Sequence, residues 1–117
     1  MSRQPDFLTL GHVTRDVQAD GSFTLGGTVT FAAQTAYHLG LAVAVVTCAD
    51  AEVARLLLEA LPGIALQICP SPQTTTFANR YHEGFRTQYL YERAVDIVET
   101  DIPWIGVTAL ALFSLVL

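Results

Sequence analysis

A run of eight residues, LAVAVVTC at 41–48, most constrains the fold of this chain. Every residue in it is apolar or β-branched, and Gly40 and Asp50 bound it. A strand with one face in water alternates polar and apolar residues, whereas an unbroken run indicates a strand that is covered on both faces. Such strands belong to parallel sheets with helices packed on them, so the run predicts an α/β protein.

Helical and strand patterns lie on both sides of this run. Residues 6–13 have the pattern of another central strand, and 28–40 place apolar residues at helical spacing before a terminal glycine. Asp50 is a suitable N-cap for a helix over 51–61, and 64–69 is typical of the next strand. Right-handed crossovers between these strands predict a largely parallel sheet flanked by helices.

Two predicted β-hairpins add to this α/β pattern. The first, at about 17–27, has apolar residues at every second position around Asp20-Gly21, a dipeptide suited to a tight turn. The second, at about 74–91, is rich in Thr, Tyr and Phe and turns at His82-Glu83-Gly84. The polar face of the first hairpin favours a half-exposed flap, so we interpret these strands as a lid.

The size and charge of the chain limit its organisation and partners. Its 117 residues allow one domain, 1–117, and hydrophobic residues make up 51% of them. A net charge of -5 disfavours nucleic acid as a partner. The N-terminus has no secretory pattern, and the uncharged stretch 102–117 is shorter than the roughly 20 residues of a membrane helix. We therefore expect a cytoplasmic protein without a membrane partner, in which this stretch is a buried strand or helix.

The order of the motifs resembles a known family. GHVTRD, then LGG, a small-residue helix ending in HLG, and a β-branched strand are similar to the N-terminal part of the PfkB-family (ribokinase-like) carbohydrate kinases. TTTFANRYHEGFRTQYL is similar to the strand pair that follows the third core strand of that family. The resemblance covers residues 6 to about 101. It implies a ribokinase-like fold with β-hairpin lid strands, and ATP-dependent phosphorylation of a hydroxyl on a sugar or nucleoside.

The resemblance also implies substrate-binding residues. Asp16 stands where the family has a carboxylate that accepts hydrogen bonds from sugar hydroxyls. Gly26 and Gly27 match the family's Gly-Gly, which lets the backbone approach the sugar closely. The alternative for Asp16 is a turn or cap residue, a common role of aspartate.

Two positions depart from the ribokinase pattern and bear on the substrate. Thr14 and Phe31 stand where ribokinase-type sequences have asparagine, and a phenylalanine side chain cannot hydrogen-bond a hydroxyl. We expect these two residues to contact a substrate other than ribose. Asn79 and Arg86 are the expected lid residues of the second hairpin. A solvated surface charge is the alternative for Arg86.

The motif that implies catalysis is missing from this sequence. In the family, the catalytic base is an aspartate in a GAGD-like motif near the C-terminus, and no such motif occurs here. We therefore predict no catalytic residue, and a chain truncated before the ATP-binding half. ATP and Mg²⁺ are implied for the full-length family, but we expect neither to bind this chain tightly and no turnover by the chain alone.

The spacing of the histidines and cysteines gives no motif of its own. His12, His38 and His82 are isolated, so we predict no metal site. Cys48 and Cys69 each end an apolar run, which is typical of reduced, buried thiols.

The alternative function is a non-catalytic binding or dimerisation module, in which exposed lid strands pair with a second copy.

Overall fold

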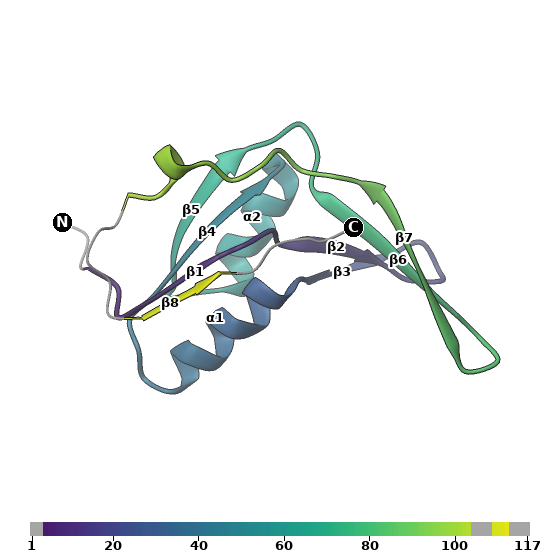
Figure 1. The fold of residues 1–117 in the computed structure, drawn as a ribbon, viewed down its shortest axis with the longest axis horizontal. Coiled ribbons are helices and arrows are strands. Elements are labelled where there is room, and N and C mark those ends of the chain that lie inside the picture. Colours follow the sequence, from purple (N-terminus) through teal and green to yellow (C-terminus); the bar gives the residue numbers. More distant parts are fainter. Residues whose placement is uncertain (1–3, 104–108, 113–117) are drawn as a thin grey trace.

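The computed structural model of the chain describes residues 4–103 and 109–112, which form two sheets and two α-helices (Figure 1). The first sheet, here called the core sheet, has the order β5-β4-β1-β8, and the second, the lid sheet, has the order β3-β2-β6-β7. The core sheet contains β1 (Phe7–Leu10), β4 (Val43–Ala49), β5 (Ala65–Pro70) and β8 (Ala109–Leu112). The lid sheet contains β2 (Thr14–Val17), β3 (Phe23–Gly26), β6 (Thr75–His82) and β7 (Phe85–Glu92).

The core sheet is parallel throughout, and all seven residues of β4 are buried, as the unbroken apolar run predicts. Helices α1 (Thr28–His38) and α2 (Ala51–Ala60) share one hydrophobic cluster with alternate residues of β4. The other face of the sheet forms a smaller cluster, against which Ile97 and Ile102 pack. The chain that covers this second face includes the short 3₁₀-helix η1 (Glu99–Asp101).

The predicted start of α2 is confirmed in atomic detail. The Asp50 carboxylate accepts a hydrogen bond from the Val53 N–H at 2.9 Å, so it satisfies one of the free donors of the first turn. Thr74 Oγ1 donates to the same carboxylate at 2.8 Å and accepts from the Asp50 N–H at 3.0 Å. Asp50 therefore joins α2 to the start of the second hairpin.

The first hairpin differs from the two-residue turn that Asp20-Gly21 predicts. Its strand β2 begins at Thr14, and residues 18–22 separate β2 from β3. The reason is local, because Asp20 Oδ1 accepts hydrogen bonds from the Ser22 N–H at 2.9 Å and from Ser22 Oγ at 2.6 Å. Asp16 lies within β2, ahead of this turn.

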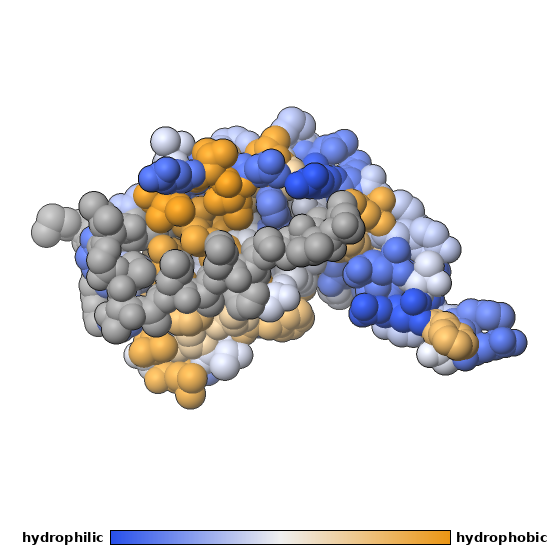
Figure 2. All heavy atoms as spheres, in the orientation of Figure 1, coloured by the Kyte–Doolittle hydropathy of each residue, from blue (hydrophilic) through white to orange (hydrophobic). Residues whose placement is uncertain are grey.

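The second hairpin has the predicted turn. Glu83 and Gly84 both have positive φ angles, 49° and 80°, as a primed two-residue turn requires. Strand β6 also pairs in parallel with β2, so the two predicted hairpins form one four-stranded sheet. Figure 2 shows mainly hydrophilic residues over the projecting lid sheet, and hydrophobic residues gathered over the core sheet and α1.

The two cysteines differ in environment. Both thiols are free, but Cys48 is fully buried whereas Cys69 is only partly buried, so the expectation of two buried thiols is wrong for Cys69. Burial raises the pKa of Cys48 to about 12, with further contributions from the Cys69 thiol and from the carboxylates of Asp101 and Asp96. The Cys48 thiol is therefore protonated at neutral pH.

Neither helix in the described part of the chain has the length and apolar character needed to span a membrane. The uncharged stretch 102–117 is described only at 102–103 and 109–112, where the second of these ranges is the strand β8. The rest of that stretch, and so most of the prediction made for it, lies outside the described residues.

Candidate substrate-binding site

A pocket of about 340 Å³ lies between the lid sheet and the N-terminal end of α1. Its volume is in the range typical of small-molecule sites. The pocket is lined by His12, Thr14 and Asp16 around β2, by Gly27, Thr28, Val29 and Phe31 at the start of α1, by Thr75, Phe77 and Asn79 on β6, and by Arg86 and Gln88 on β7.

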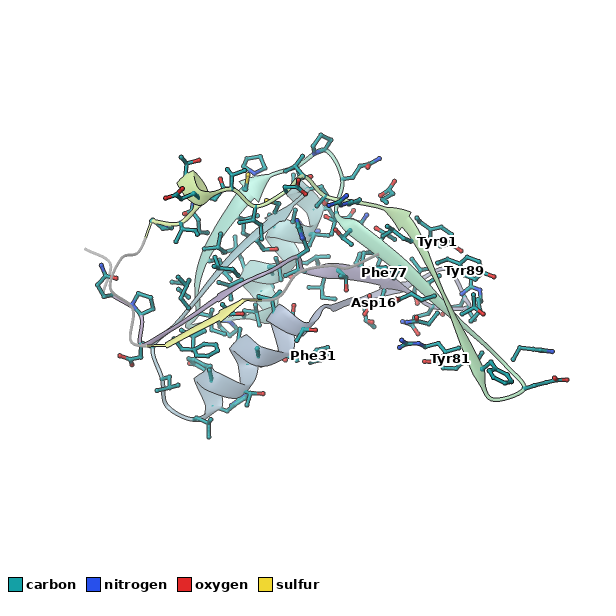
Figure 3. All side chains as sticks on the ribbon, in the orientation of Figure 1. Asp16, Phe31, Phe77, Tyr81, Tyr89 and Tyr91 are labelled. Atoms are coloured by element: carbon teal, nitrogen blue, oxygen red, sulfur yellow. The ribbon has the colours of Figure 1, made fainter. Side chains whose placement is uncertain are left out.

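One face of the lid sheet forms the floor of this pocket. Side chains alternate between the two faces of a strand, so Thr14 and Asp16 share a face. The parallel register places Thr14 beside Thr75 and Asp16 beside Phe77. Figure 3 shows Asp16 and Phe77 together on the lid sheet, with Phe31 on the first turn of α1 facing the same region.

One hydrogen bond holds the Asp16 carboxylate, and a glycine behind it leaves room for it. Thr14 Oγ1 donates a hydrogen bond to Asp16 Oδ1 at 2.7 Å. Among the described residues, no group donates to Oδ2, so this oxygen can accept from a ligand. Gly26 lies behind the carboxylate, where an added Cβ would overlap Asp16 Oδ2. The first glycine of the pair thus makes room for Asp16 and does not itself line the pocket.

The second glycine of the pair sets the entrance to α1. Gly27 has a φ angle of +90°, and a Cβ there would lie 2.7 Å from the His12 carbonyl oxygen. Gly27 is also the N-cap of α1, and no side chain caps this end of the helix. Thr28 and Val29 of this first turn line the pocket, which therefore lies at the end of α1 that has free N–H groups and the positive end of the helix dipole.

The second hairpin contributes further polar groups. Asn79 Oδ1 is buried and has no hydrogen-bond partner among the described residues. Such a buried, unpaired acceptor is costly unless a ligand or water satisfies it. Gln88 pairs with Asn79 across β6 and β7, and Arg86 has no ion-pair partner in the described ranges. Carboxylate, amide, guanidinium and backbone N–H groups thus meet in one pocket.

Six of the seven residues singled out from the sequence line this pocket, and the seventh, Gly26, supports Asp16 from behind. Their role in binding stays a prediction. Sequence reasoning missed His12, Thr28, Val29, Thr75, Phe77 and Gln88. Strand alternation was an available signal for two of them, because Thr75 and Phe77 precede Asn79 by four and two residues on the same face. His12 Nε2 lies 2.8 Å from the Val95 carbonyl and donates to it, which orients the ring.

The described residues do not form a site whose side chains suit ATP or Mg²⁺ as this pocket suits a small polar ligand. The pocket contains a single carboxylate, Asp16, whereas Mg²⁺ favours several oxygen ligands. The N-terminus of α2 is closed to an anion by the Asp50 cap. Burial would raise the pKa of Asp50, but hydrogen bonds from Val53 and Thr74 and the nearby Arg15 guanidinium outweigh it and hold this pKa below its ordinary value. Asp50 is therefore negatively charged at neutral pH.

Solved structures share this architecture. A pyrophosphate-dependent kinase in the ribokinase family, complexed with a pyrophosphate analog and myo-inositol, is 28% identical over 92% of this chain, with a TM-score of 0.75. A variant that converts a pyrophosphate-dependent myo-inositol-1 kinase into a myo-inositol-3 kinase is 25% identical over 92% of this chain, with a TM-score of 0.72. The microbiome-derived acarbose kinase Mak1 is 18% identical over 78% of this chain, with a TM-score of 0.55, and shows likeness in fold alone.

The chain spans 40%, 38% and 38% of the length of these three kinase chains. No protein-family model and no curated protein matches its sequence. The parallel core sheet, the two-hairpin lid sheet and the pocket between the lid and α1 agree with the resemblance read from the motifs. This chain therefore has a ribokinase-like fold.

Proposed function

We propose that this chain is the N-terminal, acceptor-binding part of a kinase of the PfkB type, which transfers a phosphoryl group to a hydroxyl of a sugar-like substrate. The observation that carries the proposal is the pocket in which Asp16 Oδ2, Asn79 Oδ1 and the uncapped start of α1 meet. Polyhydroxylated rings offer hydroxyls that both donate and accept, so they match a pocket containing both kinds of partner.

The pocket also favours a ring over a small linear polyol. Phe77 and Phe31 offer apolar faces beside the polar groups, and Phe31 is 61% exposed. The C–H face of a sugar or cyclitol ring packs on such surfaces while its hydroxyls bind at the edge. Two structural neighbours carry myo-inositol in their names, and this supports a cyclitol or sugar over a nucleoside.

The phosphoryl donor is either ATP or pyrophosphate. The resemblance read from the sequence implies ATP with Mg²⁺, whereas two of the neighbours named above are pyrophosphate-dependent. Transfer needs a positioned donor and charge neutralisation at the phosphoryl group, and the described residues do not provide these. We infer that this chain alone binds the acceptor without turning it over. The free thiols of Cys48 and Cys69 support a reducing, cytoplasmic location.

Ligand-dependent thermal stability tests the proposal directly. Thermal unfolding of the chain is followed by circular dichroism with myo-inositol, a panel of hexoses and pentoses, and nucleosides. We expect a cyclitol or sugar to raise the melting temperature, because a ligand at 100 times its Kd stabilises the folded state by about 2.7 kcal/mol. Asp16→Asn keeps the shape of the side chain and removes its charge. We therefore expect this variant to need at least a tenfold higher ligand concentration for the same rise in melting temperature.

Asp20→Asn is the matched control for this experiment. It removes a carboxylate from the same hairpin, but Asp20 lies in the exposed turn and does not line the pocket. We expect Asp20→Asn to respond to the ligand as the unmodified chain does. A cooperative transition that no ligand shifts, or equal responses from Asp16→Asn and the unmodified chain, would contradict the acceptor site.

A non-catalytic dimerisation module is the second candidate function. The observation in its favour is the exposed aromatic surface of the second hairpin, where Phe85, Tyr89 and Tyr91 are 76%, 47% and 55% exposed. Strand β7 is also an edge of the lid sheet, and edge strands pair readily with other chains. This candidate predicts self-association that is independent of Asp16.

A further inference from the structure

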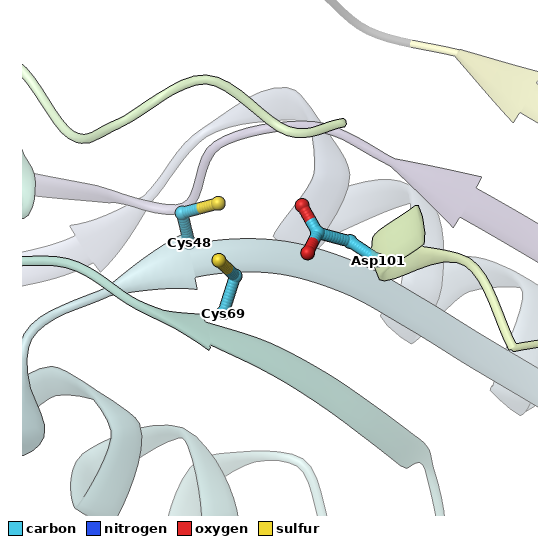
Figure 4. Close-up of side chains that lie close together, drawn as sticks. All are labelled: Cys48, Cys69 and Asp101. Atoms are coloured by element: carbon cyan, nitrogen blue, oxygen red, sulfur yellow. The ribbon is translucent and has the colours of Figure 1, made fainter. Parts of the chain in front are cut away.

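A cluster of thiol and carboxylate groups lies on the face of the core sheet opposite to α1 and α2. Cys48 on β4 and Cys69 on β5 are register partners, and Asp101 belongs to η1, which crosses this face (Figure 4). The two sulfur atoms and one carboxylate oxygen of Asp101 all lie within 4.8 Å of one another. None of these residues lines the pocket described above.

We propose that Cys48, Cys69 and Asp101 bind a thiophilic divalent metal ion of the zinc class, which ties η1 to the carboxyl ends of β4 and β5. The ion displaces the protons of the two thiols into solvent when it binds. Two thiolates and a carboxylate are established zinc ligands, whereas Mg²⁺ and Ca²⁺ prefer oxygen ligands alone. Three protein ligands leave a fourth tetrahedral position for water.

The geometry needs only a small adjustment to hold the ion. Zn–S bonds of about 2.3 Å place the sulfur atoms of a tetrahedral site about 3.8 Å apart. The present separations, within 4.8 Å, must therefore close by about 1 Å at most. Asp101 sits on a single 3₁₀ turn, so a small shift of that turn brings its carboxylate closer, and rotation of the two cysteine side chains brings the sulfur atoms closer, without moving the sheet.

The Asp101 carboxylate is already oriented by its own turn. The Val98 N–H donates to Asp101 Oδ2 at 2.8 Å, which leaves Oδ1 available as a ligand. Metal-binding carboxylates commonly have such a supporting hydrogen bond, which fixes their direction. The same contact holds the carboxylate beside the two thiols before any ion arrives.

A disulfide between the two cysteines fits the backbone less well. Neighbouring strands lie about 4.8 Å apart, and side chains of register partners leave the sheet nearly parallel to each other. A disulfide requires its Cβ atoms to approach to about 3.8 Å, so it would draw β4 and β5 together. A metal ion spans the gap between the sulfur atoms without this distortion, and it also accounts for the third group, Asp101.

Cobalt provides the test, because Co²⁺ bound by thiolates in tetrahedral geometry has intense visible absorption bands. We expect the reduced chain to bind one Co²⁺ with such bands, and Zn²⁺ to displace it. Cys69→Ser and Asp101→Asn should each weaken Co²⁺ binding at least tenfold. Both residues are partly exposed, so these variants should keep the fold, as circular dichroism will show.

Asp96→Asn is the matched control. Its carboxylate is near Cys48 but forms an ion pair with Arg93 at 3.1 Å, outside the proposed ligand set. We expect this variant to bind Co²⁺ as the unmodified chain does, and Zn²⁺ to raise the melting temperature of both. Absence of the bands, bands that survive in both ligand variants, or a Cys48–Cys69 disulfide found by intact mass in the purified protein would each overturn the proposal. The acceptor pocket does not enter any of these outcomes.

Discussion

At the scale of single residues, Asp50 shows how one side chain connects parts of the chain that are distant in sequence. It caps α2 through Val53, accepts from Thr74, and lies 3.5 Å from the Arg15 guanidinium on β2. Only 17% of its side chain is exposed, so solvent screens these interactions weakly. Asp50 thus links α2, the second hairpin and the first hairpin at one point.

The depressed pKa of Asp50 makes the stability of the chain pH-dependent. A carboxyl whose folded pKa lies below its unfolded value of about 3.9 stabilises the fold above that value, and this contribution is lost as the pH falls through the folded pKa. We expect Asp50→Ala to lower the free energy of unfolding at pH 7 by about 1 to 2 kcal/mol.

Urea unfolding of both proteins at several pH values checks this expectation. The difference between Asp50→Ala and the unmodified chain should be constant above about pH 5 and shrink below about pH 4, because protonation removes the charge of Asp50. A difference that grows on acidification would show that the carboxylate does not stabilise the folded state.

At the scale of elements, glycine decides how β3 leads into α1. Gly27 and Gly84 have similar positive φ angles, +90° and +80°. A Cβ on Gly84 would meet no atom within 4 Å, whereas a Cβ on Gly27 would lie 2.7 Å from the His12 carbonyl oxygen. A side chain at either position therefore strains the backbone to a similar degree. Only at Gly27 does it also clash with a neighbouring atom.

This pair provides a matched comparison of alanine variants. We expect Gly84→Ala to lower the free energy of unfolding by about 1 kcal/mol, because of its φ angle alone. Gly27→Ala should lower it by about 2 to 4 kcal/mol, because the backbone must also move away from His12. Urea unfolding measures both values, and equal costs would show that the approach of Gly27 to His12 is not a tight one.

At the scale of the whole molecule, the lid sheet is placed by a few contacts with the core. The Arg15 guanidinium on β2 contacts Glu52 of α2 at 2.9 Å, and within the lid sheet it also lies over the Phe23 ring at 4.7 Å. Most of the second hairpin beyond these contacts is exposed. The projecting hairpin in Figure 1 therefore offers both one wall of the pocket and a free outer face.

We expect this outer face to support a concentration-dependent dimer. Tyr89 and Tyr91 stack with ring centroids 6.5 Å apart and remain about half exposed, as surfaces that bind partners often are. Sedimentation velocity over a range of concentrations measures the association. Tyr89→Lys should shift the equilibrium toward monomer, whereas Thr35→Lys at an exposed position of α1, away from the lid sheet, is the control for added charge. A chain that stays monomeric at every concentration would remove the dimerisation candidate.

The sequence alone was sufficient for the features that depend on local pattern. The apolar run at 41–48, the Asp50 cap and the His82-Glu83-Gly84 turn predicted β4, α2 and the second hairpin, with ends that differ from the observed ones by a few residues. Motif order indicated a ribokinase-like chain, and the structural neighbours agree. These features are fixed by periodicity and turn chemistry within a few neighbouring residues.

The tertiary structure decided what depends on pairing between distant segments. The parallel pairing of β2 with β6 brings Asp16 beside Phe77, although these residues are far apart in sequence and neither strand's pattern specifies its partner. The same holds for Cys48, Cys69 and Asp101, whose spacing matches no metal motif and which meet only because β4, β5 and η1 lie side by side. Local periodicity fixes which face of a strand a side chain occupies, but only the packed fold fixes what that face meets.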